Sequence, residues 1–104
     1  MTITIEMLQQ RNKALVMVSN LTGVPVDDIM SPARTDKVAM ARHLVVWVLV
    51  TILDYSPTIV AVLLRLHRTS VIYGRQKILR MGRKLPSKEV EEFKKQLENY
   101  FVKL

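Results

Sequence analysis

The side chains best suited to chemistry lie between residues 68 and 80, where hydroxyl and basic groups recur at helical spacing. At about 100° per residue, one face of a helix here would be polar and the other apolar. The polar face would carry Thr69, Ser70, Tyr73, Lys77 and Arg80. The apolar face would carry Val71, Gly74, Ile78 and Met81. Hydroxyl and cationic groups on one face can hydrogen-bond phosphates and base edges, although helical periodicity alone favours a simple solvated face.

Two helices joined by a tight turn must present this face, and the segment 56–83 predicts them. Ser56 can cap a helix that has Pro57 in its first turn, where the missing N–H of proline costs nothing. The sequence from Arg65 through Leu66 to His67 interrupts the helical pattern, and a second helix should start near residue 68. A short buried helix, a turn and a helix with a basic outer face form the layout of a helix-turn-helix.

Side chains that would indicate catalysis or a bound cofactor form no recognisable pattern. The three glycines are scattered, and none precedes Lys-Thr or Lys-Ser, so no phosphate-binding loop is predicted. His43 and His67 have no carboxylate or cysteine near them at metal-ligand spacing. Asp27 and Asp28 are typical of a helix start, where acidic groups complement the helix dipole. We therefore expect no enzyme activity, nucleotide, metal or cofactor.

The positive charge of the chain is concentrated in one segment. The net charge is +7 over 104 residues, yet residues 1–54 hold five basic and five acidic side chains. Residues 55–88 hold eight basic side chains and no acidic ones, whereas residues 89–104 hold three basic and four acidic. A basic stretch of this kind favours a polyanionic partner, because neutralised phosphates release counterions and supply much of the affinity.

Composition limits the class of protein and its compartment. The length is that of one domain with a modest core, and 49% of the residues are hydrophobic, so disorder is not expected. Without cysteine the chain has no disulfide and no thiolate metal site. The first 13 residues lack the basic-then-apolar order of a signal peptide. We expect a cytoplasmic protein, associated with the nucleoid if its partner is DNA.

Shorter elements precede and follow the central part of the chain. A helix is expected over residues 3–20, ending at Thr22-Gly23 because glycine suits a left-handed cap. Residues 26–30 should form one or two turns, and residues 31–37 a loop. A last helix is expected over residues 87–104, with an apolar stripe formed by Val90, Phe93, Leu97, Tyr100, Phe101 and Leu104. Packing of this stripe on the first helix is the favoured interpretation, and a homodimer through it is the alternative.

The longest apolar run lies in the middle of the chain. Thr35 or Asp36 can cap a helix that continues to about Asp54. Within it, residues 44–53 include one threonine among apolar side chains, so periodicity leaves a buried strand open. The run is about half the length needed to cross a bilayer, which argues against a membrane span. A core helix is favoured, with an expected contact between two groups: Leu44, Trp47, Val48 and Ile52 against Ile59, Leu63, Val71 and Ile78.

The order and spacing of short motifs carry a family resemblance. In register and without a gap, the chain reads His-Arg-Thr-Ser-Val at residues 67–71 and ends this stretch with Lys77-Ile78. Upstream lie Thr-Gly-Val at 22–24, Val-Asp-Asp-Ile at 26–29, and Arg42 near the start of the middle helix. In this order, over residues 14–80, the chain resembles the C-terminal DNA-binding domain of the bacterial chromosomal replication initiator DnaA.

The resemblance implies a fold and a set of DNA ligands. The fold would be all-α, a single domain over residues 1–104 with five or six helices, a central helix-turn-helix and a Trp-repressor-like arrangement. The residues expected to bind DNA are Arg34, Lys37, Arg42, Arg65, His67, Arg68, Thr69, Ser70, Tyr73, Lys77 and Arg80.

Several positions depart from the family pattern. The family motif has Asp-His where this chain has His67-Arg68, so an acceptor for cytosine is replaced and a donor for guanine or phosphate is gained. The family's turn glycines are replaced by Leu64 and Arg65, and its second middle-helix arginine by Met40. These changes leave the expected fold intact, but they do not predict recognition of the initiator's usual binding site.

The function expected from these observations is sequence-specific binding of double-stranded DNA. It would serve replication initiation or transcriptional regulation without ATPase activity, because the ATP-binding module of the initiator is not represented in this sequence. One alternative is a protein-interaction module whose basic face meets an acidic partner. A second is a membrane-surface protein, suggested only by the apolar run and the positive charge.

Overall fold

The middle of the chain forms a helix that is buried on nearly every side. In the computed structural model, which describes residues 2–32, 35–73 and 87–102, every regular element is helical. Helix α3, Asp36–Trp47, continues directly into the π-helical turn η1, Val48–Ile52. Residues 44–49 are all at most 2% exposed. A helix that is apolar all round must be covered on all sides, so the expected core helix is confirmed and a buried strand is excluded.

The end of this helix differs from the expected α-helix to Asp54. The N–H of Leu53 donates to the carbonyl of Val48 at 3.0 Å, and that of Tyr55 donates to Leu49 at 2.9 Å. These bonds span one or two residues more than the bonds of an α-helix, and they widen the last turn. Asp54 then adopts a left-handed conformation with φ of +58°, which reverses the chain toward the next helix. Hydrophobic periodicity carries no signal for such a change of bonding.

The first two helices cover one side of α3. Helix α1, Ile5–Thr22, begins at Thr4, whose hydroxyl accepts a hydrogen bond from the N–H of Met7 at 3.1 Å. It ends as expected at Gly23, which has φ of +76°. Helix α2, Val26–Ile29, is a single turn that places the Ile29 side chain in the core at 1% exposure. The cap of α3 is Thr35, one of the two expected residues.

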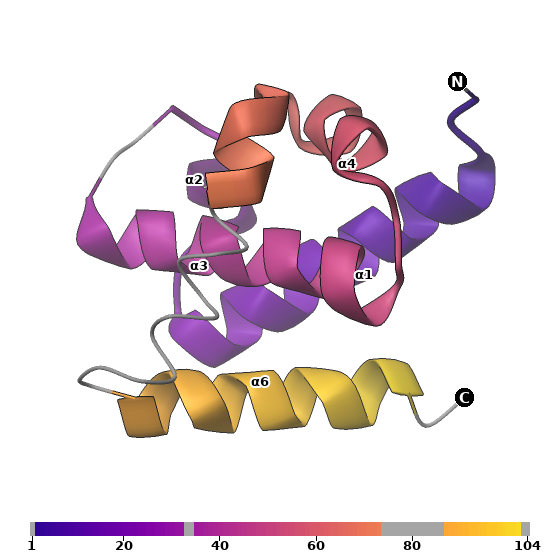
Figure 1. Cartoon of the computed structure of the whole chain (residues 1–104). Coiled ribbons are helices and arrows are strands. Elements are labelled where there is room, and N and C mark those ends of the chain that lie inside the picture. Colours follow the sequence, from indigo (N-terminus) through magenta and orange to yellow (C-terminus); the bar gives the residue numbers. More distant parts are fainter. Residues whose placement is uncertain (1, 33–34, 74–86, 103–104) are drawn as a thin grey trace.

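The last helix closes the other side of the core. Helix α6, Ser87–Val102, packs against α1 and η1 and buries Phe93, Leu97 and Phe101. Packing of the stripe on α1 is thus observed for these three residues, whereas Tyr100 is 45% exposed. The Val90 side chain and Leu104 lie outside what the structure describes. The Lys94 ammonium lies 5.4 Å from the centre of the Trp47 ring, so the lysine also covers this core residue. Figure 1 shows α6 on the side of α3 away from the helix-turn-helix.

The first half of the helix-turn-helix forms as the sequence predicts. Helix α4, Pro57–Leu64, has Pro57 at its first position and is capped by Ser56, whose hydroxyl accepts from the N–H of Ile59 at 3.2 Å. Residues 65–67 form the turn and residues 68–73 are helical (Figure 1). Val71 is fully buried and anchors this second helix in the core. The continuation of the helix-turn-helix over residues 74–83 lies outside the described residues.

The turn after α4 has the hydrogen bonds of a Schellman motif. The N–H of Leu66 donates to the Ala61 carbonyl at 2.8 Å, and the N–H of Arg65 donates to the Val62 carbonyl at 3.3 Å. The motif needs a left-handed residue after the helix, which is usually glycine. Arg65 occupies that position with φ of +56°. Because an L side chain crowds the backbone in this conformation, the turn contains local strain.

Most of the residues expected to meet in the core are buried. Leu44, Trp47, Val48, Leu63 and Val71 are buried, while Ile52 and Ile59 are half-buried; Ile78 lies outside the described residues. The radius of gyration, 12.6 Å, matches the roughly 13 Å expected for one domain of about 100 residues. In the described ranges, no helix is long and apolar enough to span a membrane.

Replacement of Trp47 tests the core. Trp47 is 2% exposed, so Trp47→Ala should lower the free energy of unfolding by about 3–5 kcal/mol through lost burial and an unfilled cavity. Urea denaturation followed by circular dichroism measures this loss. Tyr100→Ala is a suitable control, because Tyr100 is 45% exposed and its truncation leaves no cavity. Equal losses in the two variants would contradict the packing described.

Replacement of Arg65 tests the strain in the turn. Arg65→Gly should raise the free energy of unfolding by about 1 kcal/mol, because glycine adopts positive φ without a steric penalty. The control is Arg68→Gly, which removes the same charge from a helical residue and should give no gain. Thermal unfolding of both variants measures the change in stability. A loss of stability in Arg65→Gly would show that the left-handed conformation of Arg65 is unstrained.

Candidate nucleic-acid interface

The helix over residues 68–73 begins with three exposed polar side chains. The His67 carbonyl accepts a hydrogen bond from the N–H of Val71 at 3.2 Å, so His67 is the residue that precedes the first helical position. Arg68, Thr69 and Ser70 therefore form the first turn, and all three are exposed. We call residues 68–73 the recognition segment, because a helix-turn-helix places the start of this helix against the major groove.

A ring contact fixes the recognition segment against α3. The rings of His43 and Tyr73 meet edge to face, with centres 5.9 Å apart and planes at 74°. Tyr73 is nevertheless 54% exposed, so part of its side chain remains at the surface. Together with the buried Val71, two residues earlier on the inner face, this contact determines how the segment lies on the core. The polar first turn consequently faces outward.

A cleft of about 790 Å³ separates the recognition segment from the loop that follows α2. Its walls come from that loop, from α3 and from the helix-turn-helix. The lining residues are Met30, Ser31, Pro32, Arg42, His43, Val46, Leu64, Arg65, Leu66, His67, Thr69, Ser70 and Tyr73. Six of the eleven residues expected from the sequence lie here: Arg42, Arg65, His67, Thr69, Ser70 and Tyr73. The fold thus brings Arg42 of α3 and five residues of the helix-turn-helix to one concave surface.

Arg42 stabilises the wall of this cleft. Its Nε donates to the Ile29 carbonyl at 2.9 Å, and a terminal nitrogen donates to the carbonyl of Ser31. These bonds attach the end of α2 and the following loop to α3. Burial lowers the pKa of Arg42, because a less polar environment disfavours the charged form. The guanidinium remains protonated at neutral pH, since arginine ordinarily titrates far above it.

The other expected residues are more dispersed. Arg68 is exposed at the entry of the recognition segment and does not line the cleft. Lys37 is exposed near the start of α3, and its ammonium lies close to Gly23, where an added Cβ would be 3.9 Å from Nζ. That position is beside the end of α1, where backbone carbonyls attract a cation. Arg34, Lys77 and Arg80 lie outside the described residues.

Sequence reasoning did not include His43 and Ser31 among the site residues. His43 supports Tyr73, and Ser31 supplies both a lining side chain and the carbonyl that holds Arg42. A signal for His43 was present: with Arg42 and Val46 it falls on one face of α3, where two polar residues precede the long apolar run. Ser31 gave no comparable signal, because its role depends on a contact with a residue eleven positions away.

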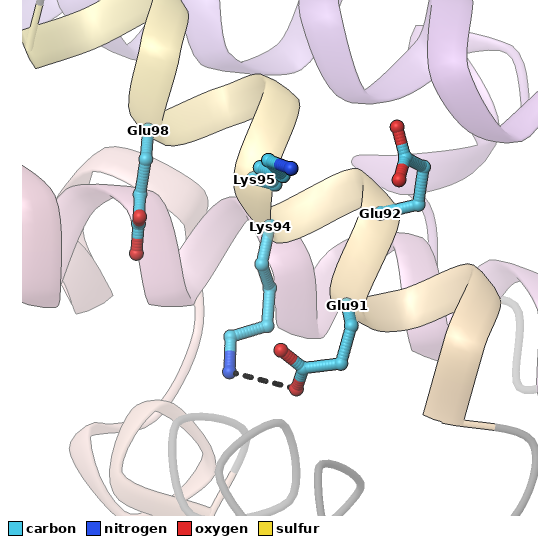
Figure 2. Close-up of a pocket in the computed structure, with 5 residues that line it drawn as sticks. All are labelled: Glu91, Glu92, Lys94, Lys95 and Glu98. Atoms are coloured by element: carbon cyan, nitrogen blue, oxygen red, sulfur yellow. Dashed lines mark hydrogen bonds and ion pairs between the residues drawn. The ribbon is translucent and has the colours of Figure 1, made fainter.

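A second hollow lies along α6 and has a different character. Its volume is about 530 Å³, and the described residues that line it are Glu91, Glu92, Lys94, Lys95 and Glu98 of α6. Figure 2 shows Glu91 and Lys94 pointing toward each other; Nζ and Oε1 are 3.4 Å apart. Alternating charges on one helix are typical of a solvated face. Across the described ranges, no group of three or more histidine or acidic side chains could hold a metal ion.

Comparison with known proteins agrees with this geometry. The family model for the bacterial dnaA protein helix-turn-helix matches residues 12–78, well over half of the chain. The matched range includes α2, α3, α4, the recognition segment and the residues that line the cleft. Among curated proteins, no sequence matches the chain. The family is a DNA-binding family rather than a catalytic one, and the all-α fold with its helix-turn-helix is the one it predicts. The chain therefore belongs to the helix-turn-helix family of bacterial DnaA proteins.

Proposed function

We propose that this chain binds double-stranded DNA in a sequence-specific manner and acts in replication initiation or transcriptional regulation, without hydrolysing ATP. The observation that carries the proposal is the exposed first turn of the recognition segment, Arg68 to Ser70, which lies beside the cleft. Six further polar residues line that cleft: Ser31, Arg42, His43, Arg65, His67 and Tyr73. Membership of a DNA-binding family supports the same conclusion. The excess of basic residues between positions 55 and 88 suits a polyanionic ligand.

The proposed contacts divide into those that read bases and those that fix position. Arg68, Thr69 and Ser70 are at the entry of the recognition segment, so we assign them to base edges and nearby phosphates. Tyr73, Lys77 and Arg80 continue the same helical face in the sequence and are assigned to phosphates. His67 and Arg65 precede the helix and would approach the backbone of one strand.

The loop before α3 forms the second proposed contact region. Arg34 and Lys37 would approach the neighbouring minor groove, as the family resemblance implies. Arg42 has a different position: two of its bonds go to carbonyls of this protein, so its first effect on DNA binding would be to hold the loop in place.

The departures from the family motif determine the experiment. An arginine at position 68 supplies two donors to the acceptors on a guanine edge, so the preferred sequence should differ from the initiator's usual site. Selection of bound duplexes from a random pool would identify the preferred sequence. A salt series on that duplex then separates the candidate functions, because phosphate contacts make affinity fall steeply as salt rises. Failure to enrich any sequence, together with tight binding to an acidic protein, would refute the proposal.

Replacement of Arg68 tests base reading. Arg68→Ala should lose about 1–3 kcal/mol of affinity for the selected duplex and much less for a scrambled duplex, because only the guanine contact is lost. Fluorescence anisotropy with both duplexes gives the specificity ratio. As a control, Lys95→Ala removes an equal charge from an exposed position on α6, the helix that lies on the side of α3 away from the helix-turn-helix (Figure 1). Equal losses on the two duplexes would make Arg68 a phosphate contact.

Replacement of Lys77 and Arg80 tests positioning. Either substitution by alanine should weaken binding to all duplexes by a similar factor and reduce the salt slope by about one, because each side chain would neutralise one phosphate. The measurement is the dependence of log affinity on log salt concentration for the selected and the scrambled duplex. If the double variant keeps the affinity and salt slope of the wild type, this face of the helix does not contact DNA.

A further inference from the structure

One side chain outside the interface contacts the end of α4. Arg11 of α1 is half-buried, and one of its terminal nitrogens donates to the Leu63 carbonyl at 3.1 Å. Its Nε and its other terminal nitrogen donate to Oδ1 of the neighbouring Asn12 at 3.1 and 3.0 Å. The guanidinium is therefore held by Asn12 on one side and directed at α4 on the other. Arg11 precedes the residues that the family model matches, 12–78.

The Leu63 carbonyl belongs to the last turn of α4, where backbone carbonyls lack partners within the helix. The Schellman bonds satisfy the carbonyls of Ala61 and Val62 through the N–H groups of Leu66 and Arg65. The Leu63 carbonyl receives the Arg11 side chain instead. A cation is favourable here, because the C-terminal end of a helix carries partial negative charge. Arg11 thus supplies from another helix a bond that the turn cannot make itself.

We propose that Arg11 is a positioning residue for DNA recognition: by holding the end of α4, it fixes the turn and the first residues of the recognition segment. The proposal rests on the proposed function, since it concerns how accurately Arg68 meets a base. Only residues 65–67 separate the end of α4 from residue 68, and Arg65 in that turn is strained. A strained turn keeps one conformation only while its surroundings hold it. The bond to Leu63 is one such restraint, and it acts two residues before the strained Arg65.

The test compares two methionine substitutions on α1. Arg11→Met removes the donors but keeps a long apolar side chain, and Lys13→Met removes an equal charge from an exposed residue two positions away. The probes are the duplex selected by the wild type from a random pool and a scrambled duplex of the same composition. Binding is measured at a temperature where circular dichroism shows every variant fully folded, which removes the effect of a simple loss of stability.

We expect Arg11→Met to lower the ratio of the two affinities roughly tenfold, the size of effect that follows loss of a hydrogen bond from a charged group. The salt slope should stay at the wild-type value, because no phosphate contact is removed. Amide exchange at Arg65 and Leu66 should become faster by a similar factor, since the turn opens more readily. Lys13→Met should leave the affinity ratio and the exchange rates within about twofold of the wild type, within the usual small effect of an exposed charge.

Three outcomes would overturn the inference. The first is an Arg11→Met protein that matches Lys13→Met in affinity ratio and exchange. The second is an equal loss on both duplexes with a reduced salt slope, which would place Arg11 against phosphate. If Arg11→Met does not fold, Asn12→Ala takes its place, because it removes only the group that holds the guanidinium; the third outcome is an unchanged ratio in that variant. If the wild type binds no duplex, the proposed function fails, and amide exchange in the same variants alone decides the role of Arg11.

Discussion

The structure depends on one constraint, the burial of residues 44–49 on every side of a single helix. Such a helix leaves no face for solvent, so each remaining element has to cover part of it: α1 and α2 on one side, α6 on another, and α4 near its end. The polar residues Arg42 and His43 stand immediately before the buried run, where α3 emerges from the core. The helix at the centre of the core therefore also forms part of the wall of the cleft at the candidate interface.

The recognition segment is held by contacts from three separate parts of the chain. Val71 enters the core, Tyr73 rests on His43 of α3, and the end of α4 is attached to α1 through the bond from Arg11 to Leu63. None of these contacts involves the exposed first turn, Arg68 to Ser70, so the groups proposed to read DNA are left unobstructed while their backbone is fixed. This separation is what a preorganised binding surface requires, because ordering side chains at the moment of binding would reduce affinity.

Local signals in the sequence identified most of the elements. Pro57 after Ser56, Gly23 after a helical stretch and the stripe of α6 each act over a few residues, and each predicted its element correctly. The π-helical turn was missed because it changes bonding without changing periodicity. The contacts of Arg42 with Ile29 and of Arg11 with Leu63 were missed because they join residues 13 and 52 positions apart. The sequence thus indicated which residues face outward, whereas the hydrogen bonds that hold them required the fold.

The location of α6 has a consequence for how the molecule would approach DNA. Glu91, Glu92 and Glu98 are exposed on that helix, whereas Arg65 and Arg68 are exposed at the helix-turn-helix on the far side of α3 (Figure 1). The charges of α6 nearly balance, because residues 87–102 hold four glutamates and three lysines. A molecule with one nearly neutral side and one basic side experiences a torque in the field of a polyanion. If the chain binds DNA as proposed, the field of the duplex would rotate the protein before contact. Fewer encounters would then begin with the helix-turn-helix facing away from the DNA. Once bound, the outer face of α6 would point into solvent as the surface available to other proteins.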